Sequence, residues 1–404
     1  MTLDMQKRAN EVIIPLYPQK KVALASGDGV RVKDTEGKSY IDFAAGIAVC
    51  SLGHNHPVMH KAITEQLDTG LIMTVGSYPT EPKLKAAELL INNCCQEQIF
   101  FCNSGAEAVE GSLKLARAWA HKNKSEDCKE FITFKGSFHG RTYGAVSATY
   151  KSLKQPKFGP YLQGMHFADY GDLDSVKALI TDKICGIIFE PVQGEGGLMP
   201  GDAQFFQGLR KLCDEHQIVM ISDEIQAGMG RMGTLMAHEA FEYEPDVVCL
   251  AKGMGSGFPV GAFMAKKKFT EAFEAGDHGT TYGGNPLATN VVYHVVSEML
   301  SDGFLDHVNK ASAHFLSKLE TLKSESNTGT ITDVRGKGLM IGIDTKFKCA
   351  SLLNKLLENG LLATQAGANT LRLTPPLTVN ESEIDEAVDI IAQTLRDETL
   401  ELVE

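Results

Sequence analysis

The 404-residue chain is 43% hydrophobic and 22% charged, a composition typical of globular proteins with a buried core. Its formal net charge of −12 argues against nucleic acid as a partner, because such proteins carry a basic surface. The chain shows neither a signal-peptide pattern nor an apolar run long enough to cross a bilayer. We therefore expect a cytoplasmic protein with no membrane partner, and the length suggests two or three domains.

The order of segments predicts an α/β fold. Residues 29–43 are typical of a hairpin that turns at Glu36 and Gly37. Further strands are predicted at 98–102, 130–134, 184–189, 218–222 and 247–250, and helices after the first of these and over 203–216. These strands are apolar throughout rather than alternating, as expected of strands buried on both faces. The pattern favours a mostly parallel sheet between helices.

The helix predicted after residues 98–102 has an apolar stripe. Val109, Leu113, Ala116 and Ala120 are spaced by four, three and four residues, which places them on one helical face. Glu110 and Lys114 have the spacing of a favourable ion pair, and we expect them to contact each other.

A smaller α+β domain is predicted at the C-terminus. A helical region covers 286–322, a hairpin 334–344 and an extended segment 371–377. The last helix is predicted to start near Asn380, with Glu383 completing a capping pair. We expect three parts: 1–50 as an N-terminal arm and part of the small domain, 51–287 as the large domain, and 288–404 as the C-terminal small domain.

Three features at predicted strand ends point to one chemistry. Ser104 and Gly105 turn a strand into a helix, whose free N–H groups suit a phosphate. Asp223 follows a buried strand, where a carboxylate needs a positive partner such as a protonated ring nitrogen. Lys252 ends another strand, and a lysine withdrawn from water attacks carbonyl groups. Taken singly, Ser104 could be an ordinary helix cap, Asp223 a partner in a salt bridge and Lys252 a solvated side chain. Taken together, the three features describe a pyridoxal 5′-phosphate site.

The sequence resembles the class III (ω-amino acid) aminotransferases, most closely their acetylornithine aminotransferase branch. The resemblance covers about residues 11–395 and implies fold type I of the pyridoxal-phosphate-dependent transferases, with a seven-stranded sheet. The motifs that carry it are GHNHP (53–57), NSGAEA (103–108), FHGRT (138–142), EPVQGEGG (190–197), DEIQ (223–226), AKGMGSGFP (251–259), HGTTYGGNP (278–286) and LRLTPPL (371–377).

The resemblance assigns the cofactor-binding residues. It implies that Lys252 forms a Schiff base with the cofactor and then moves protons, and that Asp223 pairs with the pyridinium nitrogen. It further implies a phosphate site at Ser104, Gly105 and Ala106, stacking by Phe138, contact of Gln226 near the phenolic oxygen, and contact of Thr281 with the phosphate of the other subunit. The last contact would make a homodimer with shared sites obligatory, and no metal is expected.

The resemblance also assigns the substrate-binding residues. Arg141 is similar to the residue that binds the α-carboxylate of acetylornithine, and Arg372 to the one that binds glutamate or 2-oxoglutarate. A guanidinium holds a carboxylate with two parallel hydrogen bonds. Glu195 is similar to the glutamate that neutralises Arg372 when the ω-amine is bound. Thr280 and Tyr17 complete the implied substrate site.

The apolar Ile47 favours an acylated donor, because ornithine aminotransferases usually have a tyrosine there. We expect the δ-amino group of N2-acetylornithine to be transferred to 2-oxoglutarate. Succinylornithine and N-succinyl-diaminopimelate stay open as donors, because one methylene-sized difference between acyl groups changes binding by only about 1–3 kcal/mol. 4-Aminobutyrate stays open because its branch of the family also has an apolar residue at this position, and ornithine is kept as a further alternative. Ala227, Met232 and Thr280 depart from the commonest family residues and leave the fine substrate preference open.

Other functions fit the sequence less well. GMGRMG (228–233) matches a dinucleotide motif but lacks the strand directly before it. His54, His56 and His60 suggest a zinc hydrolase without a coherent further ligand. A non-catalytic homologue used for binding would be expected to have lost Lys252. The nine cysteines are expected to be reduced, mostly buried thiols, and nothing near Cys94 and Cys95 in the sequence suggests a redox role.

Overall fold

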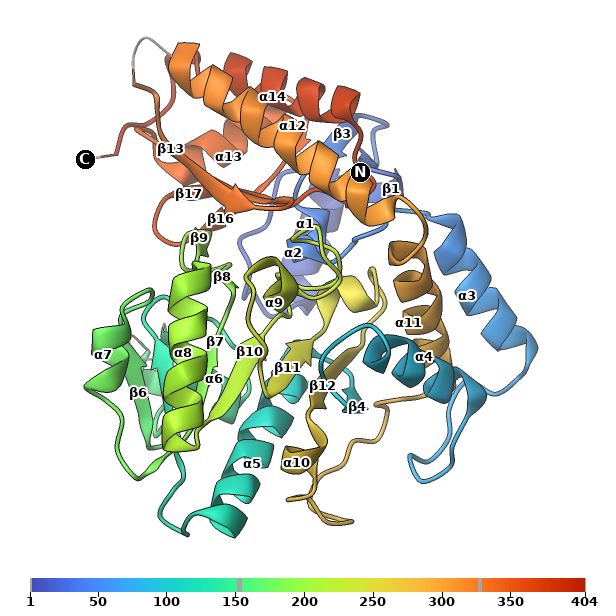
Figure 1. Ribbon diagram of the computed structural model, residues 1–404. Coiled ribbons are helices and arrows are strands. Elements are labelled where there is room, and N and C mark those ends of the chain that lie inside the picture. Colours follow the sequence, from blue (N-terminus) through green and yellow to red (C-terminus); the bar gives the residue numbers. More distant parts are fainter. Residues whose placement is uncertain (1, 151–154, 326–328, 404) are drawn as a thin grey trace.

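A seven-stranded sheet forms the centre of the larger part of the molecule (Figure 1). The computed structural model describes residues 2–150, 155–325 and 329–403. Across the sheet the order is β4-β12-β11-β10-β7-β5-β6, with β4 at Gln98–Cys102, β5 at Glu130–Phe134, β6 at Met165–Ala168, β7 at Ile184–Phe189, β10 at Val219–Asp223, β11 at Val247–Leu250 and β12 at Gly261–Ala265. Only β12 runs against its neighbours β11 and β4; the other pairs are parallel.

Helices cover both faces of this sheet. Helix α5 (Gly105–Asn123) packs on one face through the predicted stripe, with Val109, Ala116 and Ala120 fully buried. Helix α8 (Ala203–His216) packs on the other face with Phe205, Phe206 and Leu209. Because both faces are covered, the strands need apolar side chains at successive positions. The predicted mostly parallel, doubly covered sheet is confirmed.

The predicted pair of Glu110 and Lys114 is wrong. The Glu110 carboxylate accepts hydrogen bonds from Thr142 Oγ1 at 2.6 Å and from the Gly144 N–H at 2.8 Å. Lys114 Nζ donates to the Asp277 carbonyl at 2.6 Å. Tertiary partners therefore replace a pairing that stabilises an isolated helix by only about 0.2–0.5 kcal/mol.

Two separate helices replace the single helical region predicted over 286–322. Helix α11 (Pro286–Met299) is followed by α12 (Phe304–Glu325). Between them Gly303 has a φ of 82°, a left-handed conformation that ends a helix and favours glycine. Helix α11 packs on α3 (Pro57–Asp68) and α4 (Glu81–Ile91), beside the large sheet.

A second sheet lies under the C-terminal helices (Figure 1), in the order β13-β14-β17-β16. Its strands are β13 at Ile331–Lys337, β14 at Met340–Thr345, β16 at Thr364–Ala366 and β17 at Thr370–Leu373. Helices α12, α13 (Cys349–Glu358) and α14 (Glu381–Thr394) pack around it. The predicted hairpin and the capping box of Asn380 and Glu383 are both confirmed.

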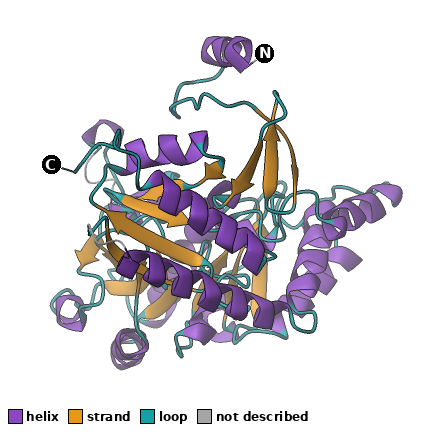
Figure 2. Ribbon diagram, turned by 90° about the horizontal axis from the view of Figure 1, so that it is seen from above, coloured by secondary structure: helices purple, strands orange, loops and turns teal. Residues whose placement is uncertain are grey.

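The N-terminal segment extends from the body of the molecule. Strands β1 (Leu24–Asp28), β2 (Arg31–Asp34) and β3 (Ser39–Asp42) form a sheet with β15 (Leu361–Leu362). Helix α1 (Thr2–Val12) stands apart from it (Figure 2), and the residues that follow expose large apolar side chains, including Ile14, Leu16 and Tyr17.

The remaining elements are α2 at Ala45–Ala48, α6 at Tyr143–Ala148, α7 at Leu173–Lys177, α9 at Ala237–Ala240, α10 at Lys267–Thr270, β8 at Val192–Gln193, β9 at Met199–Pro200, η2 at Pro156–Phe158 and η3 at Lys252–Met254. Across the described ranges, none of the helices combines the length and apolarity needed to span a bilayer.

Candidate active site

The carboxyl ends of the parallel strands meet around a cavity of about 450 Å³. This edge of an open α/β sheet is where ligands usually bind. Eight of the residues predicted from the sequence line the cavity: Ser104, Gly105, Ala106, Phe138, Arg141, Asp223, Gln226 and Lys252. They come from the four chain segments that lie at or after the ends of β4, β5, β10 and β11, which the strand order brings together.

Lys252 lies just beyond β11 with a half-buried side chain. Its φ of 43° turns the chain out of the strand into the short helix η3. Burial, and after it the nearby guanidinium of Arg372, lower the pKa of its amine to about 8, against opposing effects of Glu195 and Asp223. Among the described residues, none forms a hydrogen bond or ion pair with Nζ. The amine is therefore an unpartnered nucleophile in the cavity wall.

Asp223 is the last residue of β10 and is 4% exposed. Its Oδ2 lies 2.7 Å from Nδ1 of His139, which is completely enclosed, and its Oδ1 accepts a hydrogen bond from the Ile225 N–H at 3.2 Å. The contact with His139 therefore fixes the position of the Asp223 carboxylate, and Asp223 lines the cavity. The sequence analysis quoted His139 within FHGRT without assigning it a role, because its partner is 84 residues away.

Helix α5 points its N-terminus at the same cavity. Ser104 caps it by accepting a hydrogen bond from the Glu107 N–H at 3.3 Å. A Cβ added at Gly105 would lie 2.7 Å from Ile225 Cδ1, so the first turn is packed tightly beneath the cavity. The N–H groups of this first turn have no partner within the helix and suit an anion.

Arg372 on β17 and Glu195 are ion-paired, with the guanidinium 2% exposed. Arg372 also donates from Nε to Thr364 Oγ1 at 2.9 Å and from Nη1 to the Gln226 side-chain oxygen at 3.4 Å. Residues predicted from two motifs 177 positions apart are thus in direct contact. The pairing leaves this guanidinium neutralised in the absence of substrate.

Arg141 has a different environment. Its guanidinium is exposed and lies 5.2 Å from the centre of the Phe138 ring, at the cavity rim. No carboxylate of the described chain pairs with it. Arg141 therefore has no carboxylate partner among the described residues, whereas Arg372 is paired with Glu195.

Five predicted site residues are not among those that line the cavity: Arg372 and Glu195, described above, and Thr280, Thr281 and Tyr17. Thr280 is close, because its Oγ1 accepts a hydrogen bond at 3.0 Å from the amide of Asn103, which does line the cavity. Thr281 is exposed, and Tyr17 is 80% exposed on the N-terminal segment. Within one chain the structure does not bring Thr281 and Tyr17 to the other site residues.

Glu190 is a further cavity residue that sequence reasoning missed. Its side chain accepts hydrogen bonds from the N–H groups of Phe138, at 3.0 Å, and Gly194, at 3.2 Å. Burial raises the pKa of its carboxyl to about 7, an effect that His139 opposes and Asp223 reinforces. Glu190 therefore connects the loop that carries Phe138 with the loop that carries Glu195. In the sequence it stands in a Glu-Pro dipeptide after an apolar strand, a pattern that does not predict these hydrogen bonds.

The three histidines that suggested a zinc site, and the GMGRMG run that matched a dinucleotide motif, make structural contacts. His54 contacts Asp42 at 2.9 Å, His60 contacts Asn55 at 2.7 Å, and the His56 ring accepts from the N–H of Val58. Searching the described residues finds no cluster of three metal-ligating side chains. In GMGRMG the buried Arg231 donates to the carbonyls of Leu339 and Pro375, and the run forms turns rather than a strand-to-helix junction.

A strand-end lysine, a buried aspartate and a helix N-terminus around one cavity are features of transaminases that act through a bound aldehyde cofactor. The family model of the class-III aminotransferases matches residues 16–395, and the chain belongs to that family. The acetylornithine aminotransferase of Clostridium acetobutylicum is 42% identical over 94% of this chain and 98% of its own length. The succinylornithine transaminase of Salmonella agona is 40% identical over 95% and 94%. Among solved structures, the N-acetylornithine aminotransferase of Stenotrophomonas maltophilia matches with a TM-score of 0.83 and 35% identity, over 96% of this chain and 97% of that one.

Proposed function

We propose that the protein transfers the δ-amino group of N2-acetyl-L-ornithine to 2-oxoglutarate, giving N-acetyl-L-glutamate 5-semialdehyde and L-glutamate. The observation that carries the reaction type is the Lys252 amine, which has a lowered pKa and no partner in a cavity that also holds Asp223. The proposal includes pyridoxal 5′-phosphate as cofactor, and a cytoplasmic homodimer as the working unit.

The residues of the cavity fit this cofactor. Lys252 offers an amine for its aldehyde, Asp223 offers a carboxylate for its ring nitrogen, and the first turn of α5 offers N–H groups for its phosphate. Phe138 and Gln226 stand on the walls between them. When bound, pyridoxal phosphate supplies an aldehyde carbon for the amine and a ring that accepts electrons.

Lys252 would first hold the cofactor covalently and then act as acid and base. With the cofactor bound, the Lys252 amine would be the group that takes the proton from the amine-bearing carbon of the donor and gives one back. An amine with a pKa of about 8 is suited to this, because it is able to give and take a proton near neutral pH. Asp223, held by His139 at 2.7 Å, keeps a negative charge facing the ring.

The two arginines would let one pocket accept two different substrates. The donor presents one carboxylate and an apolar acyl group, and the exposed Arg141 is free to bind that carboxylate. The acceptor 2-oxoglutarate carries a second carboxylate. For it, Glu195 would leave Arg372 and free this guanidinium for a bidentate bond. Ile47 is 42% exposed and lies two residues before Val49, which lines the cavity; an apolar side chain there would suit an acylated rather than a charged α-amine.

The identity of the donor rests on the relatives and on Ile47. Acetylornithine aminotransferases match at 42%, 41% and 40% identity over almost the whole chain, which supports N2-acetylornithine as the donor. A succinylornithine transaminase matches at 40%, so N2-succinylornithine is the second candidate. Both donors share the carboxylate and the δ-amine, and differ only in the acyl group that the pocket must hold.

The test is a half-reaction without acceptor. The purified protein, loaded with pyridoxal phosphate, is mixed separately with N2-acetylornithine, N2-succinylornithine, ornithine and 4-aminobutyrate, and the loss of its visible absorbance is timed. We expect kcat/KM to be highest for N2-acetylornithine, with succinylornithine next. A higher value for ornithine or 4-aminobutyrate would move the donor and keep the reaction type. Failure to take up the cofactor would reject the proposal.

A further inference from the structure

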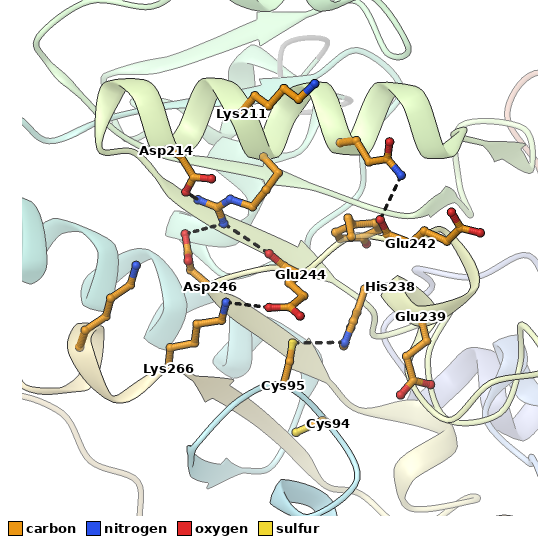
Figure 3. A pocket seen from close by; sticks show the side chains of 14 residues that line it. Cys94, Cys95, Lys211, Asp214, His238, Glu239, Glu242, Glu244, Asp246 and Lys266 are labelled. Atoms are coloured by element: carbon orange, nitrogen blue, oxygen red, sulfur yellow. Dashed lines mark hydrogen bonds and ion pairs between the residues drawn. The ribbon is translucent and has the colours of Figure 1, made fainter.

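A second cavity, of about 990 Å³, lies between α8, Cys94 and Cys95, and residues 238–246 (Figure 3). Its walls carry many charged side chains, most of them paired with each other: Arg210 with Asp214 and Asp246, and Lys266 with Glu244. Figure 3 shows Cys95 within it, joined to His238 by a hydrogen bond. No residue of this cavity lines the candidate active site.

Cys95, His238 and Glu224 form a linear relay. Cys95 Sγ lies 3.4 Å from His238 Nε2, and His238 Nδ1 lies 2.8 Å from Glu224 Oε1. Glu224 is fully buried and also accepts hydrogen bonds from the N–H groups of Ala237 and His238. The carboxylate therefore fixes the imidazole, and the imidazole presents its second nitrogen to sulfur, which is how thiol nucleophiles are activated elsewhere.

The pKa of His238 is raised, which favours its protonated form beside Cys95. Burial lowers the pKa of His238, but the carboxylate of Glu224 and the hydrogen bond to Cys95 outweigh burial and raise it to about 10. The protonated imidazole is able to donate a hydrogen bond from Nε2 to the Cys95 sulfur and to give that proton to a leaving group beside it. Cys94, Glu239 and Tyr243 are further titratable groups beside this cluster, and Glu244, Asp246 and Lys266 line the same cavity.

Gln96 adds an independent observation. Its side chain is 2% exposed, and its Nε2 donates to Cys95 Sγ at 3.1 Å and to the Pro245 carbonyl at 3.0 Å. The Pro245 carbonyl fixes which end of the amide faces sulfur. The Oε1 of the same amide is buried and has no partner among the described residues. A buried acceptor without a donor is costly, so this amide is held in place by its two Nε2 hydrogen bonds, one of them to sulfur.

The other cysteines lack this environment. Cys94, the neighbour in sequence, contacts only carbonyl oxygens, and burial raises the pKa of its thiol to about 12. Burial likewise raises the pKa of the half-buried Cys50. The remaining six cysteines are buried. Cys95 combines partial exposure, an open cavity and two nitrogen donors.

We propose that Cys95 is a modification site at which a small hydroperoxide oxidises the thiol to a sulfenic acid. The thiolate sulfur attacks one peroxide oxygen, so that an S–O bond forms and the O–O bond breaks. The second oxygen leaves as hydroxide and takes the Nε2 proton of His238, giving water and a neutral imidazole. Sulfur loses two electrons and the peroxide gains them. This site is independent of the transamination proposed above.

The first test uses the unaltered, cofactor-loaded protein. It is exposed briefly to substoichiometric hydrogen peroxide, sulfenic acids are trapped with dimedone, and the labelled peptides are quantified by mass spectrometry. We expect Cys95 to be labelled at least about 10-fold faster than Cys94 or Cys50, because they lack the activating histidine. Equal labelling of the three, or faster labelling of Cys94 or Cys50, would overturn the proposal.

The second test removes the imidazole. His238→Asn should lower the rate of Cys95 labelling about 10-fold or more, whereas His314→Asn should leave it unchanged. His314 is the matched control because it also pairs with a carboxylate, that of Asp385, at 2.8 Å. Circular dichroism checks that each variant folds. An unchanged Cys95 rate in a folded His238→Asn protein would overturn the relay, and the unaltered protein supplies the decisive comparison should that variant not fold.

Discussion

At the scale of single residues, the site contains groups that folding alone would not favour. Lys252 keeps an amine half-buried without a partner, and Arg141 exposes a guanidinium that no described carboxylate neutralises. Glu190 places a carboxyl where burial raises its pKa to about 7. The half-buried Lys252 and the buried Glu190 cost stability in the cofactor-free chain, whereas the solvated Arg141 does not. All three offer an interaction to a ligand, so their substitution separates stability from function.

Lys252→Met should stabilise the cofactor-free chain at neutral pH. The pKa of the folded amine is about 8, below the ordinary 10.5, so the unfolded state binds more protons between these values. The penalty is complete below pH 8 and disappears as pH rises towards 10.5. The pKa difference corresponds to at most about 3 kcal/mol. Urea unfolding at pH 7 and pH 10.5 measures it; a variant no more stable than the parent at pH 7 would contradict the lowered pKa.

Arg141→Lys should weaken the donor and spare the cofactor. A lysine keeps the charge but loses the two parallel hydrogen bonds, at about 1.5–3 kcal/mol for bonds to a charged group. We expect KM for N2-acetylornithine to rise about 10- to 100-fold while the visible absorbance of bound cofactor is unchanged. Arg396→Lys, at another exposed arginine, is the control. A normal KM in Arg141→Lys would remove Arg141 from the substrate site.

At the scale of elements, the site depends on how closely β12 approaches the start of α5. Strand β12 begins at Gly261, which pairs with Cys102 at the end of β4. A Cβ at Gly261 would lie 2.4 Å from the backbone oxygen of Ser104, the N-cap of α5. The sequence analysis did not predict β12, because GAFMA follows a glycine-rich loop and runs against the other strands.

Gly261→Ala should therefore disturb the cofactor site from a distance. The added methyl meets backbone rather than a flexible side chain, so either the strand or the helix N-terminus must shift, at about 1–3 kcal/mol. We expect lower stability and an affinity for pyridoxal phosphate reduced about 10-fold, measured by titrating the cofactor-free protein. Gly76→Ala is the matched control, because nothing lies within 4 Å of its added Cβ. An unchanged cofactor affinity would show that the phosphate site does not depend on this contact.

At the scale of the whole molecule, one chain leaves part of the predicted site unassembled. Thr281 and Tyr17 are exposed, and neither lines the cavity. Large apolar side chains of the N-terminal segment, such as Ile14 and Leu16, are 75% and 77% exposed, and such surface usually marks an interface. The proposed homodimer, in which each chain completes the site of the other, predicts that these residues act at the partner's site.

A mixing experiment tests this sharing. Lys252→Ala and Thr281→Ala chains are purified separately, dissociated and reassociated together at limiting pyridoxal phosphate. If Thr281 serves the other subunit, each mixed dimer contains one site with both defects and one intact site. Activity should then exceed the mean of the two parents, since the intact site has full activity. If activity only equals that mean, Thr281 acts within its own chain or not at all.

The sequence by itself determined the class of fold, the family and the local position of each motif. Apolar strands, capped helices and the residue types in NSGAEA, DEIQ and AKGMG follow from short stretches of chain, where each feature depends on its neighbours. The tertiary structure alone decided what depends on distant contacts: the pairing of Arg372 with Glu195, His139 behind Asp223, the loss of the Glu110–Lys114 pair, and His238 beside Cys95. Side-chain partners far apart in sequence are set by the order of the strands, and that order is a property of the folded core rather than of any one segment.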